Sequence, residues 1–223
     1  PASGSGGVPI GASTKIEVVF VDGPSPVAAS TAQLTLNGKA VTPTTTKSGK
    51  ETTVTYTAAA GSLTASTVYT ATFTVGDSST PPNLRTVDLV FTTERLPITS
   101  AAFEQSSDGL VVIEAENFHG LKPQGDHTWS FNTQTRGFSG EGFLQATPDV
   151  GVNQSASPDL LTGAPRLDYK VKFSKTGTHY VWIRGMAPGA LEGLDPGAND
   201  SINAGIDGDQ PDSARRIDVT FPG

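Results

Sequence analysis

The chain has 223 residues, and 15 Lys and Arg against 22 Asp and Glu give it a formal charge of −7 at pH 7. This acidic balance argues against binding to nucleic acids or anionic membranes, because both need clustered basic side chains. No apolar run approaches the roughly 20 residues that span a bilayer, so membrane insertion is not expected. Cysteine is absent, which excludes disulfides and thiolate metal sites. The length allows one large domain or two small ones.

The composition changes near residue 100, which favours two domains. Residues 1–100 carry six basic and six acidic side chains, whereas the remainder carries nine basic and sixteen acidic ones. Both tryptophans and all three histidines also lie in the second part. We therefore expect a β-sandwich over residues 1–95, a connector over 96–108 and a second β-domain over 109–223.

The first part has a regular succession of short strands and turns. Strands are predicted over 15–21, 52–57, 68–75 and 86–92, and Asn37-Gly38 is a strong signal for a tight hairpin. Turn signals every 8–12 residues without helical periodicity are typical of a β-sandwich. This part contains no histidine, cysteine or carboxylate cluster from which a catalytic site could be built.

These residues also resemble a known family. The runs LTLNGKAV, TTVTYT and VYTATFTV are similar to bacterial immunoglobulin-like domains that recur in secreted multidomain proteins, over about residues 8–94. The resemblance implies a spacer and a secreted or cell-surface location.

The second part begins with the sequence LVVIEAENF, over residues 110–118. On a strand, Glu114 and Glu116 share one face, with Cβ atoms about 7 Å apart. Two like charges held this way favour a cation between them, and Ca²⁺ takes six to eight oxygen ligands. The alternative is a pair of solvated glutamates on an exposed strand edge. A catalytic pair is disfavoured, because catalytic carboxylates face each other across a cleft.

Further strands are predicted in the remainder of the chain. Residues 167–173 and 179–184 alternate around the turn Thr176-Gly177 and predict a hairpin in which Trp182 is a core residue. Residues 200–208 and 216–221 predict two more strands. The stretch of residues 192–212 is rich in acids, and we interpret it either as a solvated loop or as a second cation site. Its six acids are Glu192, Asp195, Asp200, Asp207, Asp209 and Asp212.

The order of these segments resembles carbohydrate-binding modules. The second part resembles carbohydrate-binding modules of families 6 and 35 and the C-terminal domain of glycoside hydrolase family 115. The runs that carry this resemblance are, in chain order, IEAENF, GFSGEGFL, LDYKVKF, THYVWIRG and DSINAGIDG. The resemblance implies a jelly-roll sandwich without catalytic machinery and a structural Ca²⁺ held by Glu114 and Glu116. It also implies a sugar site in which an aromatic ring stacks on the sugar while polar side chains bond to its hydroxyls. The candidates for this sugar site are Trp129, Asn132, Arg184 and Asn203.

Two questions stay open, namely the role of Trp129 and the way in which the second domain closes. Trp129 is either a lid on the core or the sugar platform. Modules of this kind continue through several strands beyond the segment that matches DSINAGIDG, whereas this sequence stops at Gly223. Either the fold closes in a shorter way, or the sequence is trimmed, or another chain supplies the strands by β-augmentation.

The expected function is non-catalytic binding of an extracellular polysaccharide, with the immunoglobulin-like unit as a spacer. The alternative is a structural or adhesive extracellular protein that assembles by strand pairing with neighbouring copies or another chain. An enzyme is disfavoured. The nucleophile-elbow pattern fails because Glu141 stands where a glycine is needed, so any catalytic domain would lie outside these residues.

Overall fold

The computed structural model describes residues 1–148, 162–186, 201–215 and 217–218, and the protein is almost entirely β. Helical structure is minimal in these ranges and includes one 3-10 turn, η2 (Asp212–Ala214). The prediction of an all-β protein is therefore confirmed. No helix in the described part of the chain is long and apolar enough to cross a membrane.

The chain divides into two compact units that do not follow the sequence in a single cut. The first contains Pro1–Ile98, Glu114–Phe118 and Trp129–Gln145, and the second contains Thr99–Ile113, His119–Thr128 and Ala146–Gly223. Two short segments of the second half thus belong to the same compact unit as the whole first half.

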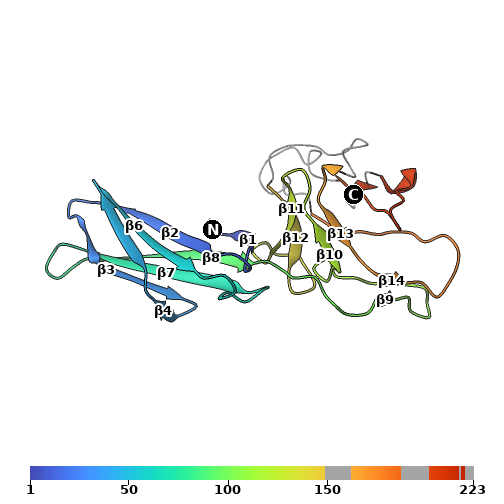
Figure 1. The fold of residues 1–223 in the computed structure, drawn as a ribbon, viewed down its shortest axis with the longest axis horizontal. Helices are drawn as coiled ribbons and strands as arrows, with labels where there is room; N and C mark the ends of the chain where they lie inside the picture. Colours follow the sequence, from blue (N-terminus) through green and yellow to red (C-terminus); the bar gives the residue numbers. More distant parts are fainter. Residues whose placement is uncertain (149–161, 187–200, 216, 219–223) are drawn as a thin grey trace. The chain divides into compact units, whose positions relative to one another are not determined.

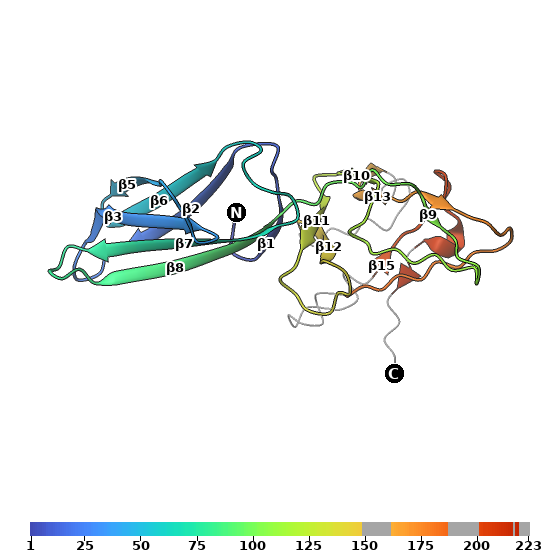
Figure 2. The same ribbon diagram turned by 90° about the horizontal axis from the view of Figure 1, so that it is seen from below.

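The first unit contains a β-sandwich made of two sheets (Figures 1 and 2). One sheet has five strands in the order β1-β8-β7-β3-β4, and the other has three in the order β2-β6-β5. The strands are β1 (Ser5–Val8), β2 (Thr14–Val21), β3 (Val27–Leu36), β4 (Lys39–Val41), β5 (Thr44–Ser48), β6 (Glu51–Ala58), β7 (Val68–Asp77) and β8 (Leu84–Thr93).

Strand alternation explains how the sandwich closes. Ile16 and Phe20 on β2, Val54 on β6, and Phe73 on β7 are buried, while the residues between them face outward or are only half-buried. These inward side chains form one hydrophobic core between the two sheets. Burial of alternate positions is what fixes the register of each strand.

The predicted hairpin at Asn37-Gly38 is confirmed. Leu36 pairs with Lys39 across the turn, and the φ angles of Asn37 and Gly38 are 48° and 75°. A two-residue turn with both φ angles positive matches the twist of the flanking strands, and asparagine and glycine tolerate that conformation best.

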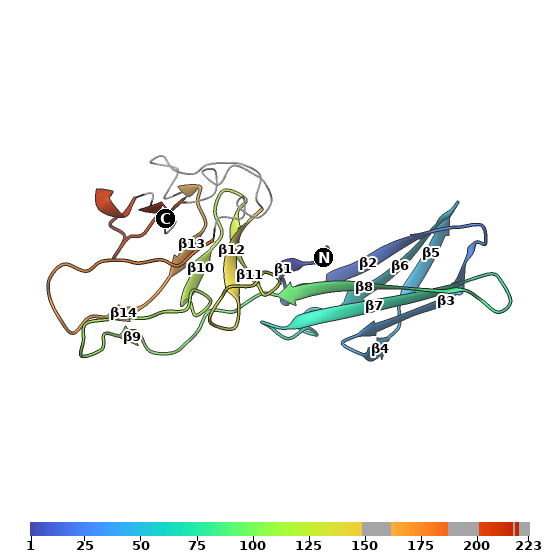
Figure 3. The same ribbon diagram turned by 180° about the vertical axis from the view of Figure 1, so that it is seen from behind.

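The remaining strands pair only in twos within the described residues (Figure 3). They form the pairs β10-β13, β11-β12, β14-β9 and β15-β16. Their bounds are β9 (Phe103–Glu104), β10 (Gly120–Lys122), β11 (Thr128–Asn132), β12 (Phe143–Thr147), β13 (Arg166–Asp168), β14 (Val171–Lys172), β15 (Ser201–Ile202) and β16 (Ile217–Asp218). The jelly-roll assignment stays a prediction, since two-stranded pairs do not define it.

Two strand predictions in the second half are wrong. Residues 110–118 form no strand: the chain makes a turn at Ala115–Glu116, in which the Asn117 N–H donates to the carbonyl oxygen of Glu114 at 2.9 Å. Residues 179–184 form no strand either, so the hairpin with 167–173 is absent. Trp182 is 91% exposed and is not a core residue. Alternation predicts a strand only where a partner strand supplies the backbone hydrogen bonds.

Other predictions fall partly outside the described residues. Of the strand predicted over 200–208, the structure describes β15, and of the strand over 216–221 it describes β16. The acids Glu192, Asp195 and Asp200 lie outside the described residues.

Candidate functional site

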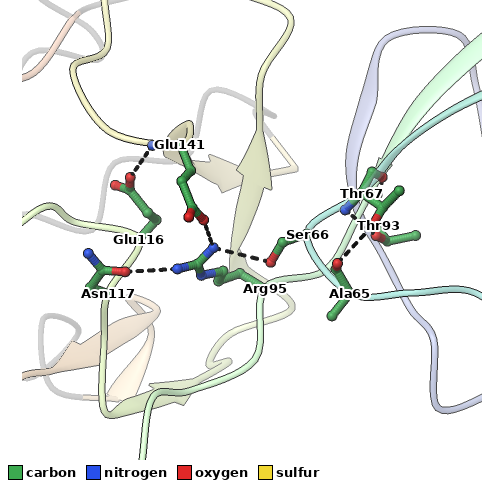
Figure 4. A network of polar contacts seen from close by, with 8 residues as sticks. All are labelled: Ala65, Ser66, Thr67, Thr93, Arg95, Glu116, Asn117 and Glu141. Carbon is green, nitrogen blue, oxygen red and sulfur yellow. Dashed lines mark hydrogen bonds and ion pairs between the residues drawn. The ribbon is translucent and has the colours of Figure 1, made fainter. Parts of the chain in front are cut away.

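Arg95, just after β8, is the centre of a polar network in the first unit (Figure 4). One guanidinium nitrogen donates to the Glu141 carboxylate and to Ser66 Oγ at 3.4 Å, and the other donates to Asn117 Oδ1 at 2.8 Å. The guanidinium carbon also lies 5.7 Å from the centre of the Phe131 ring. With its side chain only 16% exposed, Arg95 ties the end of the sandwich to the two segments from the second half.

Glu114 and Glu116 meet at the loop of residues 139–141. Glu116 is 2% exposed, and its Oε1 accepts a hydrogen bond of 2.8 Å from the Glu141 N–H. The Glu114 carboxylate accepts from Ser139 Oγ at 3.0 and 3.1 Å. A Cβ added to Gly140 would collide with the Glu116 carboxylate and lie 3.3 Å from Glu114 Cγ. Both glutamates therefore contact one loop, which requires glycine at its centre.

The charges at this loop are unbalanced. The carboxylates of Glu114 and Glu116 contact the loop, whereas the carboxylate of Glu141, a residue of the loop, pairs with Arg95. A buried carboxylate is costly unless a cation or several donors compensate it. Carboxylate oxygens are hard ligands of the kind that Ca²⁺ takes, and Glu114 and Glu116 are the residues at this loop that could hold such an ion. The described residues contain no group of three or more His, Cys, Asp or Glu arranged to hold a metal ion, so other oxygens would complete such a shell.

The four predicted sugar-binding residues are divided between the units. Trp129 and Asn132 lie on β11 in the first unit, while Arg184 and Asn203 lie in the second. Asn132 is buried, and its Oδ1 accepts from the N–H groups of Thr133 and Gln134 at 2.8 and 3.0 Å. Its amide is thus engaged in a turn, and neither unit holds all four residues.

The most exposed aromatic residues are not among the four predicted sugar-binding residues. Tyr180 is 81% exposed and Trp182 is 91% exposed, and Arg184 follows at the next alternate position. The neighbouring His179 ring packs on Phe173 at 4.3 Å between ring centres, and His179 Nε2 lies 3.3 Å from Gln105 Nε2. The spacing Tyr-x-Trp-x-Arg is the sequence signal that marks this segment.

Comparison with known proteins adds little about function. No protein-family model matches the chain, and no solved structure matches it. The chain is similar to "Uncharacterized protein P23" of Formosa agariphila, with 24% identity over 137 residues, covering 51% of this chain and 31% of that protein. The chain therefore spans about a third of the length of this relative, whose name assigns no activity.

Proposed function

We propose that the chain is a non-catalytic polysaccharide-binding protein that acts at the cell surface or after secretion. The observation that carries this proposal is the exposure of Tyr180 and Trp182, with Arg184 two residues further on. The faces of a sugar ring are apolar C–H surfaces and its edge is polar, so aromatic rings and a guanidinium match the two kinds of surface. In this proposal Trp182 takes the stacking role that the sequence suggested for Trp129.

The first sandwich serves as a spacer in this proposal. Its predicted likeness to immunoglobulin-like domains supports that role, as does its outward surface of small polar side chains. Examples are the cross-strand pairs Thr44 with Thr55 and Thr46 with Thr53. A surface of this kind offers no broad aromatic face for stacking on a sugar.

Ca²⁺ is the proposed structural ion, bound by Glu114 and Glu116. It would offset the buried charge of Glu116 and hold the residue 139–141 loop against the turn at Ala115–Glu116. Saturating Ca²⁺ should raise the melting temperature by roughly 5–10 °C, measured by far-UV circular dichroism against EDTA. Glu116→Gln should abolish the shift, and Glu104→Gln, at an exposed ion pair with Lys172, should retain it. Equal melting temperatures with Ca²⁺ and with EDTA would refute the proposed calcium site.

The sugar proposal is tested by affinity electrophoresis against a panel of plant and algal polysaccharides. Trp182→Ala should weaken retardation by one polymer at least about tenfold, which corresponds to the loss of one good stacking contact. Val112→Ala is the matched control, because Val112 is an exposed apolar residue of the second unit outside residues 179–184. Equal retardation of the two variants would refute the role of Trp182.

A second candidate function rests on the same segment. Val181 and Ile183 are also exposed, so apolar side chains occupy four successive positions. These residues form no strand here, but a segment with apolar side chains at successive positions is typical of a strand in the interior of a sandwich, which favours its pairing with strands of a neighbouring polypeptide. The protein would then be a structural or adhesive component. In that case Ile183→Ser should reduce assembly in sedimentation experiments, whereas a pure sugar site should lose affinity through Trp182→Ala alone.

A further inference from the structure

The four edge strands of the first sandwich are not equally protected against pairing. Within this unit the sheets end at β1, β4, β5 and β2. The first three have four, three and five residues, and β4 and β5 carry Lys39 and Lys47. Short strands and lysines are devices by which proteins prevent edge-to-edge association. β2 is eight residues long and fully paired with β6 on its other side.

The outward face of β2 is partly apolar. Val19 is 48% exposed and Val21 is 65% exposed, while Ile16 and Phe20 point into the core. The remaining outward residues, Lys15 and Glu17, form an ion pair of 2.5 Å, so the strand presents no net charge to an approaching partner. Within the described ranges, the backbone ladder of β2 runs to β6 and to no other strand. Figure 3 shows β6 between β2 and β5.

We propose that β2 is a self-association site, at which a second copy of this chain adds its own β2 in antiparallel orientation. Charge and length of overlap together select the register. Pairing Glu17 with Glu17 of the second copy would place like charges directly opposite, which is unfavourable. Pairing Ile16 with Ile16 would place Lys15 opposite Glu17, but it brings only residues 14–18 of each copy into contact. Pairing Val18 with Val18 avoids the Glu17 pair and keeps residues 15–21 of both copies in contact. It places Val21 opposite Lys15 and Val19 opposite Glu17, and the two sheets β5-β6-β2 become one continuous sheet across a two-fold axis.

This register makes a charge-swap test possible. Sedimentation velocity from micromolar to about 1 mM should show a reversible increase to twice the monomer mass. Val21→Lys puts a lysine opposite Lys15 on both sides of the axis and should raise the dissociation constant at least about tenfold. Adding Lys15→Glu to Val21→Lys turns both contacts into attractive pairs and should restore association. Thr46→Lys on the exposed face of β5 is the control and should change nothing.

Each outcome bears on the proposal. Far-UV circular dichroism and melting temperature establish that Val21→Lys still folds, as expected for a residue that is mostly exposed. A chain that stays monomeric throughout the concentration range overturns the proposal. A dimer that is unaffected by Val21→Lys, or is not restored in the double variant, shows that another surface is used. The test is independent of sugar binding.

Discussion

The two compact units differ in how far their apolar side chains are withdrawn from water. Every fully buried hydrophobic residue among those described, including Phe118 and Phe131, lies in the first unit. The second unit leaves Tyr180, Trp182 and Ile206 largely exposed. The first unit has two sheets that face each other, whereas the sheets of the second are strand pairs. Alternating apolar residues thus form a core only where a second sheet covers them.

The two units also differ in strand pairing. In the first unit, the local hairpins β3-β4, β5-β6 and β7-β8 accompany the long-range pairs β1-β8 and β2-β6. In the second, β9 pairs with β14 and β10 pairs with β13, across more than 40 residues. Long-range pairs lose more chain entropy before their contacts form.

The largest expected effect on the free energy of unfolding is the loss of a core side chain, compared with the loss of an exposed aromatic one. Phe73 has no exposed surface, so Phe73→Ala should lower the free energy of unfolding by about 3–5 kcal/mol. Trp182→Ala removes a larger side chain from an exposed position and should change it by less than about 0.5 kcal/mol. Urea unfolding followed by far-UV circular dichroism measures both. Similar losses in the two variants would mean that Trp182 is buried in the protein in solution.

The next effect concerns the Arg95 network. Arg95→Met keeps the aliphatic stem but removes the bonds to Ser66, Asn117 and Glu141, and should cost about 1–3 kcal/mol. Arg85→Met, at an exposed position on β8, is the matched control and should be nearly neutral. If the two variants unfold at the same urea concentration, the network contributes nothing to the first unit.

A smaller effect is expected at the loop that contacts the two glutamates. Gly140→Ala forces the buried Glu116 carboxylate to move and should cost about 1–2 kcal/mol. Gly11→Ala introduces a methyl group with no neighbour within 4 Å and serves as the control. Thermal unfolding compares them. An unchanged melting temperature for Gly140→Ala would show that the Glu116 contact is not maintained in solution.

The smallest effect is a dependence of stability on pH. Hydrogen bonds from Ser79 and then Asn83 hold the pKa of Asp77 well below its usual range. Because the pKa is lowered in the folded state, the stabilisation is complete above about pH 4 and is lost as the pH falls further. Asp77→Asn should therefore weaken the loss of stability in acid, and Asn83→Ala should weaken it in part. Urea titrations between about pH 2 and 6 measure the slopes, and identical slopes in wild type and Asp77→Asn would contradict this assignment.

Local signals account for what could be predicted. The hairpin at Asn37-Gly38 and the strands β2, β6 and β7 follow from turn residues and from alternation within each segment. The sequence also singled out Glu114 and Glu116, yet it placed them on a strand. The structure places them at a turn whose partner is a loop about 25 residues later, around Gly140. No local pattern encodes that contact. Similarly, the alternating pattern around Trp182 indicates a strand but cannot predict whether another strand covers the tryptophan.

Affinity electrophoresis of the chain and its Trp182→Ala variant, with Ca²⁺ and again with EDTA, tests the central claim most directly. The account predicts that one polysaccharide retards the wild-type protein, that EDTA weakens the retardation, and that Trp182→Ala nearly removes it. Absence of retardation by every polymer would contradict the sugar-binding function and would leave assembly through strand pairing as the supported alternative.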